Sequence, residues 1–112
     1  MRVAIVVAVL ALAGCSPAPT SFAGTWGVDQ EQCKIPQELA EAPIVLTEKG
    51  YDQHEAHCTF STVTSTGPGT WKVDAACTVE GNPQTETMEF ALKGDTLTIN
   101  PGPDSKPLVR CP

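Results

Sequence analysis

Apolar and polar residues alternate with a period of two along most of the chain after residue 21, a pattern typical of β-strands. The alternation starts with Phe22, Gly24, Trp26 and Val28, and an apolar run follows at 44–47. Residues 48–50 predict a turn, and 51–66 predict one long polar strand that bends near His57. Residues 37–41, which lie between two prolines, are long enough for a helical turn only.

The best-specified hairpin lies around Thr66-Gly67-Pro68-Gly69, where two glycines and a proline separate two alternating runs. With Gly67-Pro68 as the loop, the predicted register pairs Trp71 with Thr64, Val73 with Thr62, Ala75 with Phe60, and Cys77 with Cys58. This register places all eight residues on one face. A slip of one residue would divide them between the two faces, so the pattern favours this register.

A second hairpin is predicted around Gly94-Asp95. It places Leu92 opposite Leu97 and Phe90 opposite Ile99, and Met88 extends the same apolar face. Turns at 80–83 and 101–104 and a final strand at 107–111 bring the total to about seven strands.

The predicted fold is therefore all-β: a small up-and-down antiparallel meander that forms a barrel or half-barrel, as one domain over residues 22–112. Large side chains compete for its interior, namely Trp26, Trp71, Phe22, Phe60, Phe90 and Met88. We expect them to leave little room for a ligand cavity, which favours a solid binding module over a carrier.

Four cysteines of the domain, Cys33, Cys58, Cys77 and Cys111, predict two disulfides in an oxidising compartment. The hairpin register places Cys58 opposite Cys77 and leaves Cys33 for Cys111, at the same end of a meander. The main alternative pairs Cys33 with Cys58 and Cys77 with Cys111, and it requires the long strand to break near His57. Spacings of the Cys-x-x-Cys kind are missing, which favours structural bridges over redox activity.

The N-terminus has the three parts of a secretory signal: Met1-Arg2, an apolar run of 11 residues from Val3 to Ala13, and a small-residue end. That run is shorter than the roughly 20 residues of a membrane-spanning helix. Its end, Leu12-Ala13-Gly14-Cys15, matches the lipobox of bacterial lipoproteins at all four positions. The resemblance implies a signal peptide at 1–14 and lipidation of Cys15. The Pro- and Ser-rich composition that follows predicts a short tether, so that 15–21 form the lipidated N-terminus and tether. Ser16 after the cysteine suggests, by similarity to enterobacterial sorting, the outer membrane with the domain facing the periplasm.

The charge of the chain excludes some partners. Loss of Arg2 with the signal leaves six Lys/Arg against 13 Asp/Glu, a formal charge of minus seven. Such a charge repels phosphate backbones and anionic headgroups, which argues against nucleic acid and leaves the lipid as the membrane anchor.

The candidate chemistry is sparse, and we expect no enzyme activity and no cofactor. His54, Glu55 and His57 are weak candidates for metal binding, one residue short of the His-Glu-x-x-His pattern. On a strand, the two imidazoles would point to opposite faces, so no metal site is predicted. The sequence contains no Gly-x-Ser-x-Gly motif, and its carboxylates are interpreted as scattered outward positions.

The framework Phe22-Ala23-Gly24-Thr25-Trp26-Gly27, Trp71-Lys72-Val73, Gly94-Asp95 and Arg110-Cys111-Pro112 resembles small uncharacterised exported proteins of alphaproteobacteria. More distantly, the chain is similar to the metalloprotease-inhibitor and lysozyme-inhibitor lipoproteins, which insert a terminus or loop into an enzyme's active site. Four domain cysteines depart from both inhibitor groups, and no inhibitory residue carries over.

Together these features predict a lipid-anchored binding module of the cell envelope, with inhibition of a protease or lysozyme as its specific form and a basic enzyme as the partner. Two alternatives are a structural outer-membrane lipoprotein that contacts other envelope components, and a metal-binding envelope protein.

Overall fold

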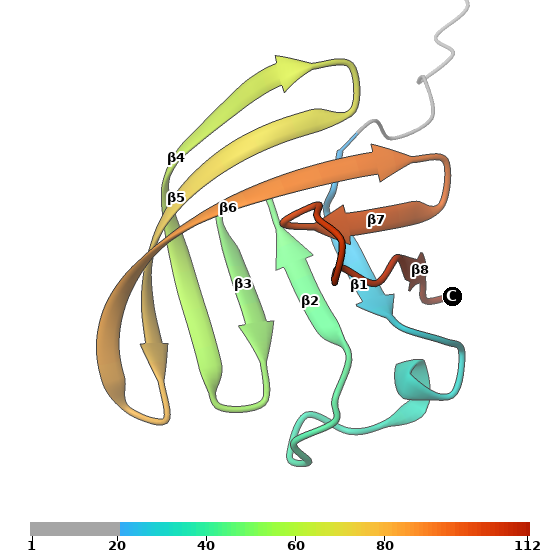
Figure 1. Cartoon of the computed structure of the whole chain (residues 1–112). Helices are drawn as coiled ribbons and strands as arrows, with labels where there is room; N and C mark the ends of the chain where they lie inside the picture. Colours follow the sequence, from blue (N-terminus) through green and yellow to red (C-terminus); the bar gives the residue numbers. More distant parts are fainter. Residues whose placement is uncertain (1–20) are drawn as a thin grey trace, which may run out of the picture.

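The computed structural model describes residues 21–112, in which eight antiparallel strands form a closed barrel in chain order (Figure 1). The strands are β1 (Gly24–Gly27), β2 (Ile44–Thr47), β3 (Gly50–Gln53), β4 (Ala56–Gly67), β5 (Thr70–Val79), β6 (Asn82–Lys93), β7 (Thr96–Ile99) and β8 (Leu108–Arg110). One short 3-10 helix, η1 (Gln32–Lys34), follows β1. The all-β meander is confirmed, with one strand more than predicted.

The predicted signal, Cys15 and the tether up to residue 20 lie outside the described residues. Within the described part of the chain, no helix has the length and apolar character needed to cross a membrane.

The additional strand lies within residues 51–66. The prediction of one long bent strand there is wrong, because these residues form a hairpin of β3 and β4. Its two-residue turn is His54-Glu55, flanked by the pair Gln53 and Ala56. His54 adopts a left-handed φ of 51°. Its amide donates to Gln37 Oε1 at 2.9 Å, and its Nδ1 lies 2.9 Å from the Gln37 carbonyl oxygen. Contacts from a distant loop thus support a turn that contains neither Gly nor Asn, so the local sequence gave no turn signal.

The β4–β5 register follows the prediction at one end of the hairpin only. Cys58 pairs with Cys77 and Phe60 with Ala75, but a β-bulge at Ser61 shifts the next pairs by one residue, so that Val63 faces Val73. A second irregularity between Ser65 and Gly67 shifts the last pair, Gly67 with Thr70, by one residue more. The Ser61 hydroxyl donates to the Asp74 carbonyl at 3.1 Å, within the bulge.

Two predictions for this hairpin are therefore wrong. Thr62 and Thr64 pair with the exposed Asp74 and Lys72 and share their outer face rather than the core face. The loop is Pro68-Gly69 rather than Gly67-Pro68, because Gly69 supplies the left-handed φ of 71° and proline needs no amide partner there. In the next hairpin, the predicted pairs of Leu92 with Leu97 and Phe90 with Ile99 are confirmed.

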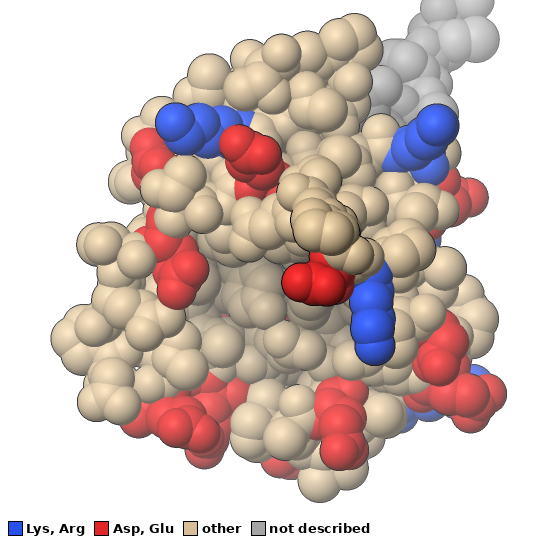
Figure 2. All heavy atoms as spheres, in the orientation of Figure 1, with Lys and Arg blue, Asp and Glu red and all other residues tan. Residues whose placement is uncertain are grey.

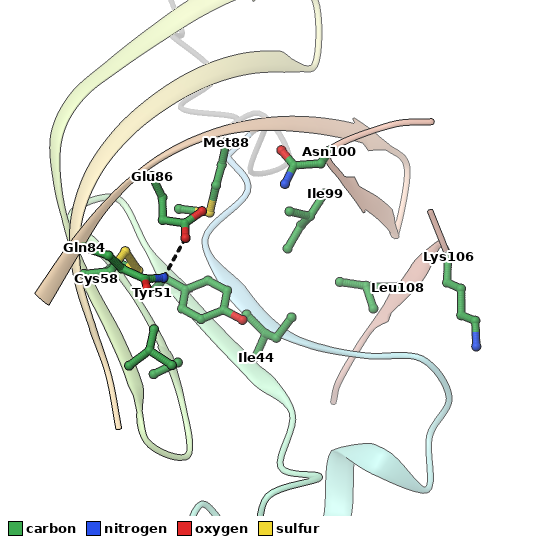
Figure 3. Close-up of a pocket in the computed structure, with 13 residues that line it drawn as sticks. Ile44, Tyr51, Cys58, Gln84, Glu86, Met88, Ile99, Asn100, Lys106 and Leu108 are labelled. Atoms are coloured by element: carbon green, nitrogen blue, oxygen red, sulfur yellow. Dashed lines mark hydrogen bonds between the residues drawn. A yellow bond between two sulfur atoms is a disulfide. The ribbon is translucent and has the colours of Figure 1, made fainter. Parts of the chain in front are cut away.

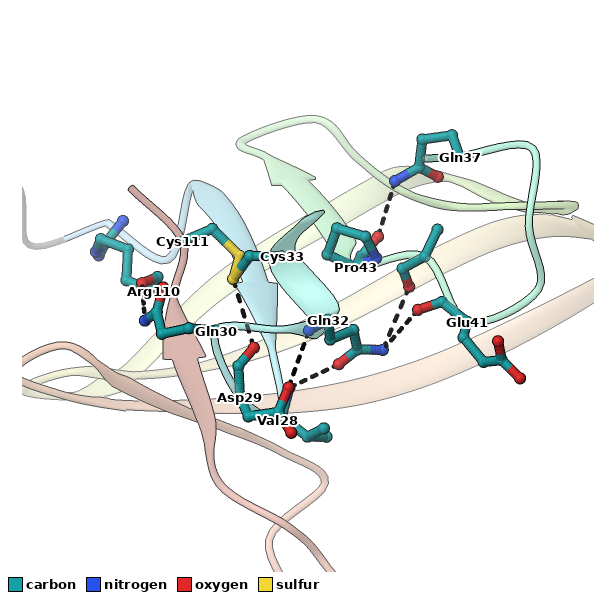
Figure 4. The surroundings of a disulfide bond; sticks show 11 residues. Val28, Asp29, Gln30, Gln32, Cys33, Gln37, Glu41, Pro43, Arg110 and Cys111 are labelled. Atoms are coloured by element: carbon teal, nitrogen blue, oxygen red, sulfur yellow. Dashed lines mark hydrogen bonds between the residues drawn. A yellow bond between two sulfur atoms is a disulfide. The ribbon is translucent and has the colours of Figure 1, made fainter. Parts of the chain in front are cut away.

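Both predicted disulfides are present: Cys58–Cys77 across neighbouring strands, and Cys33–Cys111 between η1 and the end of β8. Figure 4 shows the second bridge and the loop around it. Gln32 organises that loop: its side chain accepts from the Val28 amide at 2.6 Å and donates to the Glu41 carbonyl at 3.2 Å. The bridge therefore ties an ordered loop to the strand that closes the barrel against β1.

Aromatic side chains fill one part of the barrel. Phe22 contacts Phe60, Trp71 and Phe90 with ring centroids 4.8 to 6.1 Å apart. Trp26 is fully buried nearby, and its indole donates to the Phe22 carbonyl at 2.9 Å. The predicted interior positions of these residues are correct, and they form the core together with Leu46, Val73, Met88 and Leu97.

Candidate functional site

The inward side chains of β5 and β6 become smaller and more polar along the barrel. The register pairs Trp71 with Phe90, then Val73 with Met88, Ala75 with Glu86 and Cys77 with Gln84. The aromatic pair fills its part of the interior, but an alanine and a cystine sulfur cannot fill the same width between eight strands. The barrel is therefore solid where the aromatic residues gather and hollow beyond Met88.

A cavity of about 370 Å³ occupies the hollow part. Its lining comes from every strand except β1 and comprises Ile44, Tyr51, Ala56, Cys58, Cys77, Val79, Gln84, Glu86, Met88, Ile99, Asn100, Lys106 and Leu108 (Figure 3). Figure 2 shows this face of the molecule hollowed, with acidic side chains around it. The expectation that bulky side chains leave little room for a cavity is wrong, because those side chains gather at one end.

Glu86 points into this cavity although its side chain remains exposed to water. The reason is the short pairing of β7, which reaches only from Phe90 to Lys93 of β6 and leaves the first part of β6 uncovered on that side. The Gln84 amide donates to Glu86 Oε1 at 2.7 Å. The interpretation of all carboxylates as outward positions is therefore wrong for Glu86.

Tyr51 extends across the cavity from the opposite wall (Figure 3). Its hydroxyl donates to Gln53 Oε1 at 2.8 Å, and the Gln53 amide donates to the Ala42 carbonyl at 2.9 Å. Burial, and secondly the negative charge of Glu86, raise the pKa of the Tyr51 phenol above its ordinary value of 10.0. Tyr51 is thus neutral at physiological pH and keeps its hydrogen bond to Gln53.

Asn100 and Lys106 complete the rim from the segment between β7 and β8. Asn100 has a left-handed φ of 52° and binds both main-chain groups of Glu89. Its own amide donates to the Glu89 carbonyl at 2.7 Å, and its Oδ1 accepts from the Glu89 amide at 2.9 Å. Lys106 is on the side of the cavity away from Glu86 (Figure 3).

The weak metal candidates are not brought together around one point. His54 lies in the β3–β4 turn with Nε2 3.9 Å from Glu55 Oε2, whereas His57 Nδ1 contacts Asp52 Oδ1 at 2.7 Å. Among residues 21–112, no group of three His, Cys, Asp or Glu side chains has the arrangement of a metal site. Cys15, the predicted lipidation site, lies outside the described residues.

Sequence reasoning missed the polar residues of the cavity, although one signal was available. Period-two alternation from Phe90 through Met88 places Glu86 and Gln84 on the same inner face. Tyr51 and Lys106 carried no comparable local signal, because their positions depend on the unpredicted turn at His54-Glu55 and on the segment between β7 and β8. Comparisons with known proteins found no matching protein-family model, no matching curated protein and no matching solved structure.

Proposed function

We propose that this chain is a non-catalytic binding protein of the cell envelope, anchored by lipid on Cys15, that takes a small amphipathic cation into its barrel cavity. One observation carries the proposal: an apolar cavity with a carboxylate, Glu86, at an inward position of its mouth. Ligand pockets typically combine such apolar walls with a few polar groups that orient the ligand. The volume, near the lower end of the usual range, suits a small ligand or a single side chain.

The choice of a cation rests on charge. The Glu86 carboxylate lies at the cavity mouth, where it can contact a bound ammonium. Tyr51 adds a neutral hydroxyl, and the exported domain carries a formal charge of minus seven. Among residues 21–112, Lys106 is the one cationic residue of the lining, and it lies at the other rim. An ammonium in the mouth thus gains a charge-assisted hydrogen bond, whereas a carboxylate meets repulsion from Glu86 and from the domain as a whole.

The anchor is a separate part of the proposal. It rests on the lipobox residues and on the two disulfides, which fit an exported protein. Two or more acyl chains hold a protein stably on a membrane. A Cys15→Ser variant should lose incorporation of labelled fatty acid and appear in the soluble fraction; continued labelling would remove this part of the proposal.

A matched pair of aromatic probes tests the cavity. We expect 2-phenylethylamine to bind the full chain in detergent micelles, and 3-phenylpropionate to bind at least tenfold more weakly. NMR shift changes should gather at Tyr51 and Met88. Glu86→Gln should remove most of the preference for the amine, whereas Glu89→Gln should retain it, because Glu89 is exposed on the outer face of the same strand. Equal binding of both probes, or shift changes away from the cavity, would contradict the proposal.

Inhibition of a basic enzyme is a second candidate, supported by the acidic surface. On the face in Figure 2, Asp and Glu side chains outnumber Lys and Arg, and such a surface accelerates association with a basic partner. Lysozyme and secreted metalloproteases, the targets of the lipoproteins that the sequence resembles, are the enzymes to assay. Full activity at micromolar concentrations of the chain would exclude this form of the proposal.

A further inference from the structure

The first part of β6 is an open sheet edge beside the cavity. From Asn82 to Glu89, β6 pairs with β5, and no strand of residues 21–112 covers its other side over this length. In Figure 1, this part of β6 lies at the lower left of the barrel, next to β5. Such an edge presents main-chain donors and acceptors that can pair with another strand.

The open edge has defined ends. Asn100 occupies both main-chain groups of Glu89, and Pro83 lacks an amide hydrogen. Main-chain groups of alternate residues point to the same neighbour in an antiparallel sheet. Because those of Glu89 point to Asn100, the main-chain groups of Thr87 and Thr85 point to the open side. Two residues therefore offer an amide and a carbonyl each, directly beside the cavity mouth.

We propose that this edge binds an extended basic peptide segment by strand addition, with a Lys or Arg side chain inserted into the cavity beside Glu86. The peptide residue opposite Glu86 would be a non-hydrogen-bonded pair, whose side chain lies on the same face as Glu86. Its neighbours would pair with Thr85 and Thr87. The inference rests on the proposed cavity for the location of the cation and on the open edge for the main-chain pairing.

Charge distinguishes this partner from a second copy of the chain. Two β6 edges paired around Glu86 would place like carboxylates opposite each other, and each domain carries a charge of minus seven. With a basic segment, both repulsions become attractions: its cation pairs with Glu86, and the acidic domain attracts it before contact. Charge therefore disfavours pairing with the same edge of a second copy and favours pairing with a cationic strand.

The probe for this inference is the acetylated and amidated peptide Thr-Val-Thr-Lys-Thr-Val-Thr, titrated into the full chain in detergent micelles. We expect it to bind at least tenfold more tightly than the same peptide with Glu in place of Lys. N-methylation of the two residues that flank Lys should weaken binding at least tenfold, because it removes the amides that face β6. Thr85→Pro should do the same, whereas Thr85→Val keeps the edge amide and should bind within twofold of the native chain.

The outcomes separate the two proposals. If 2-phenylethylamine binds but the Lys peptide binds no better than its N-methylated form, strand addition is wrong and the cavity proposal stands. If the Lys peptide binds more tightly than the Glu peptide, than the N-methylated peptide and than it binds to Thr85→Pro, and the amine does not bind, the edge is a peptide site and the small-ligand proposal fails. Concentration-dependent dimerisation that Thr85→Pro abolishes would show that a second copy is the occupant and would overturn the inference. Thr85 lies on an edge position that tolerates proline, and the N-methylated peptide gives the same test without any change to the protein.

Discussion

Tyr51 and Glu86 occupy inner-face positions where an apolar residue would pack better. Both side chains line the cavity, and each is held by a residue of its own strand: the Glu86 carboxylate accepts from Gln84 at 2.7 Å, and the Tyr51 phenol donates to Gln53 at 2.8 Å. Departures from the alternating pattern are expected where function, rather than stability, selects the residue. At the residue scale, this pair is the strongest sign that the open end of the barrel does more than complete the fold.

The Tyr51 phenol should titrate above 10.0, and Glu86 should contribute to the shift. Burial is the larger cause and the Glu86 charge the smaller, so Glu86→Gln should lower the pKa of Tyr51 without returning it to 10.0. Because the pKa is raised in the folded state, the contribution of Tyr51 to stability is fully present and independent of pH below pH 10.0. Above it, stability falls with rising pH because the unfolded chain ionises first.

Tyrosinate absorbance measures this titration without interference, because Tyr51 is the only tyrosine in the chain. Glu89→Gln serves as the control and should leave the midpoint unchanged. A native midpoint at the ordinary value would show that Tyr51 is not enclosed, and the cavity geometry would then be wrong.

At the scale of elements, the sequence predicted the parts that depend on local pattern. The Gly94-Asp95 hairpin and the pairing of Cys58 with Cys77 followed from alternation and turn residues. The bulge at Ser61 and the turn at His54 could not be predicted, because each is stabilised by a residue distant in the chain, Asp74 and Gln37 respectively. The cavity could not be predicted from alternation or from turn residues, because it depends on how far β7 pairs along β6.

Two glycines at hairpin turns provide a matched test of turn packing. Gly69 and Gly81 have φ values of 71° and 82°, so alanine at either position incurs the cost of a left-handed conformation, about 1 kcal/mol or more. A Cβ at Gly69 would also lie 2.6 Å from the Leu92 carbonyl oxygen, whereas one at Gly81 would meet no atom within 4 Å.

Gly69→Ala should therefore reduce the free energy of unfolding by at least about 1 kcal/mol more than Gly81→Ala, because the β4–β5 turn must move away from β6. Urea denaturation of the two variants gives the comparison. Equal losses would mean that the turn at Gly69 does not pack against Leu92 as described.

At the scale of the whole molecule, the barrel is divided into a filled end and a hollow end, and the two disulfides serve different parts of it. Cys58–Cys77 forms part of the cavity lining. Cys33–Cys111 joins the loop after β1 to the residue after β8, beside the short pairing that closes the barrel. Two residue pairs connect β1 with β8, as few as connect β7 with β8, so the outer bridge reinforces one of the two short pairings that hold β8 in the barrel.

Loss of the outer bridge should destabilise the molecule more than loss of the inner one. The linked cysteines are 78 residues apart in the outer bridge and 19 apart in the inner bridge. In the chain-entropy model, these separations correspond to roughly 4.5 and roughly 3 kcal/mol. The double variants Cys33→Ala/Cys111→Ala and Cys58→Ala/Cys77→Ala should therefore differ in urea midpoint, with the first unfolding at the lower concentration. Removal of the sulfurs of Cys58 and Cys77 also enlarges the cavity, and this loss of packing acts against the expected order. If the inner variant unfolds first, packing around the cavity contributes more to stability than the closure of the long loop, and the hollow end must be more tightly built than its volume suggests.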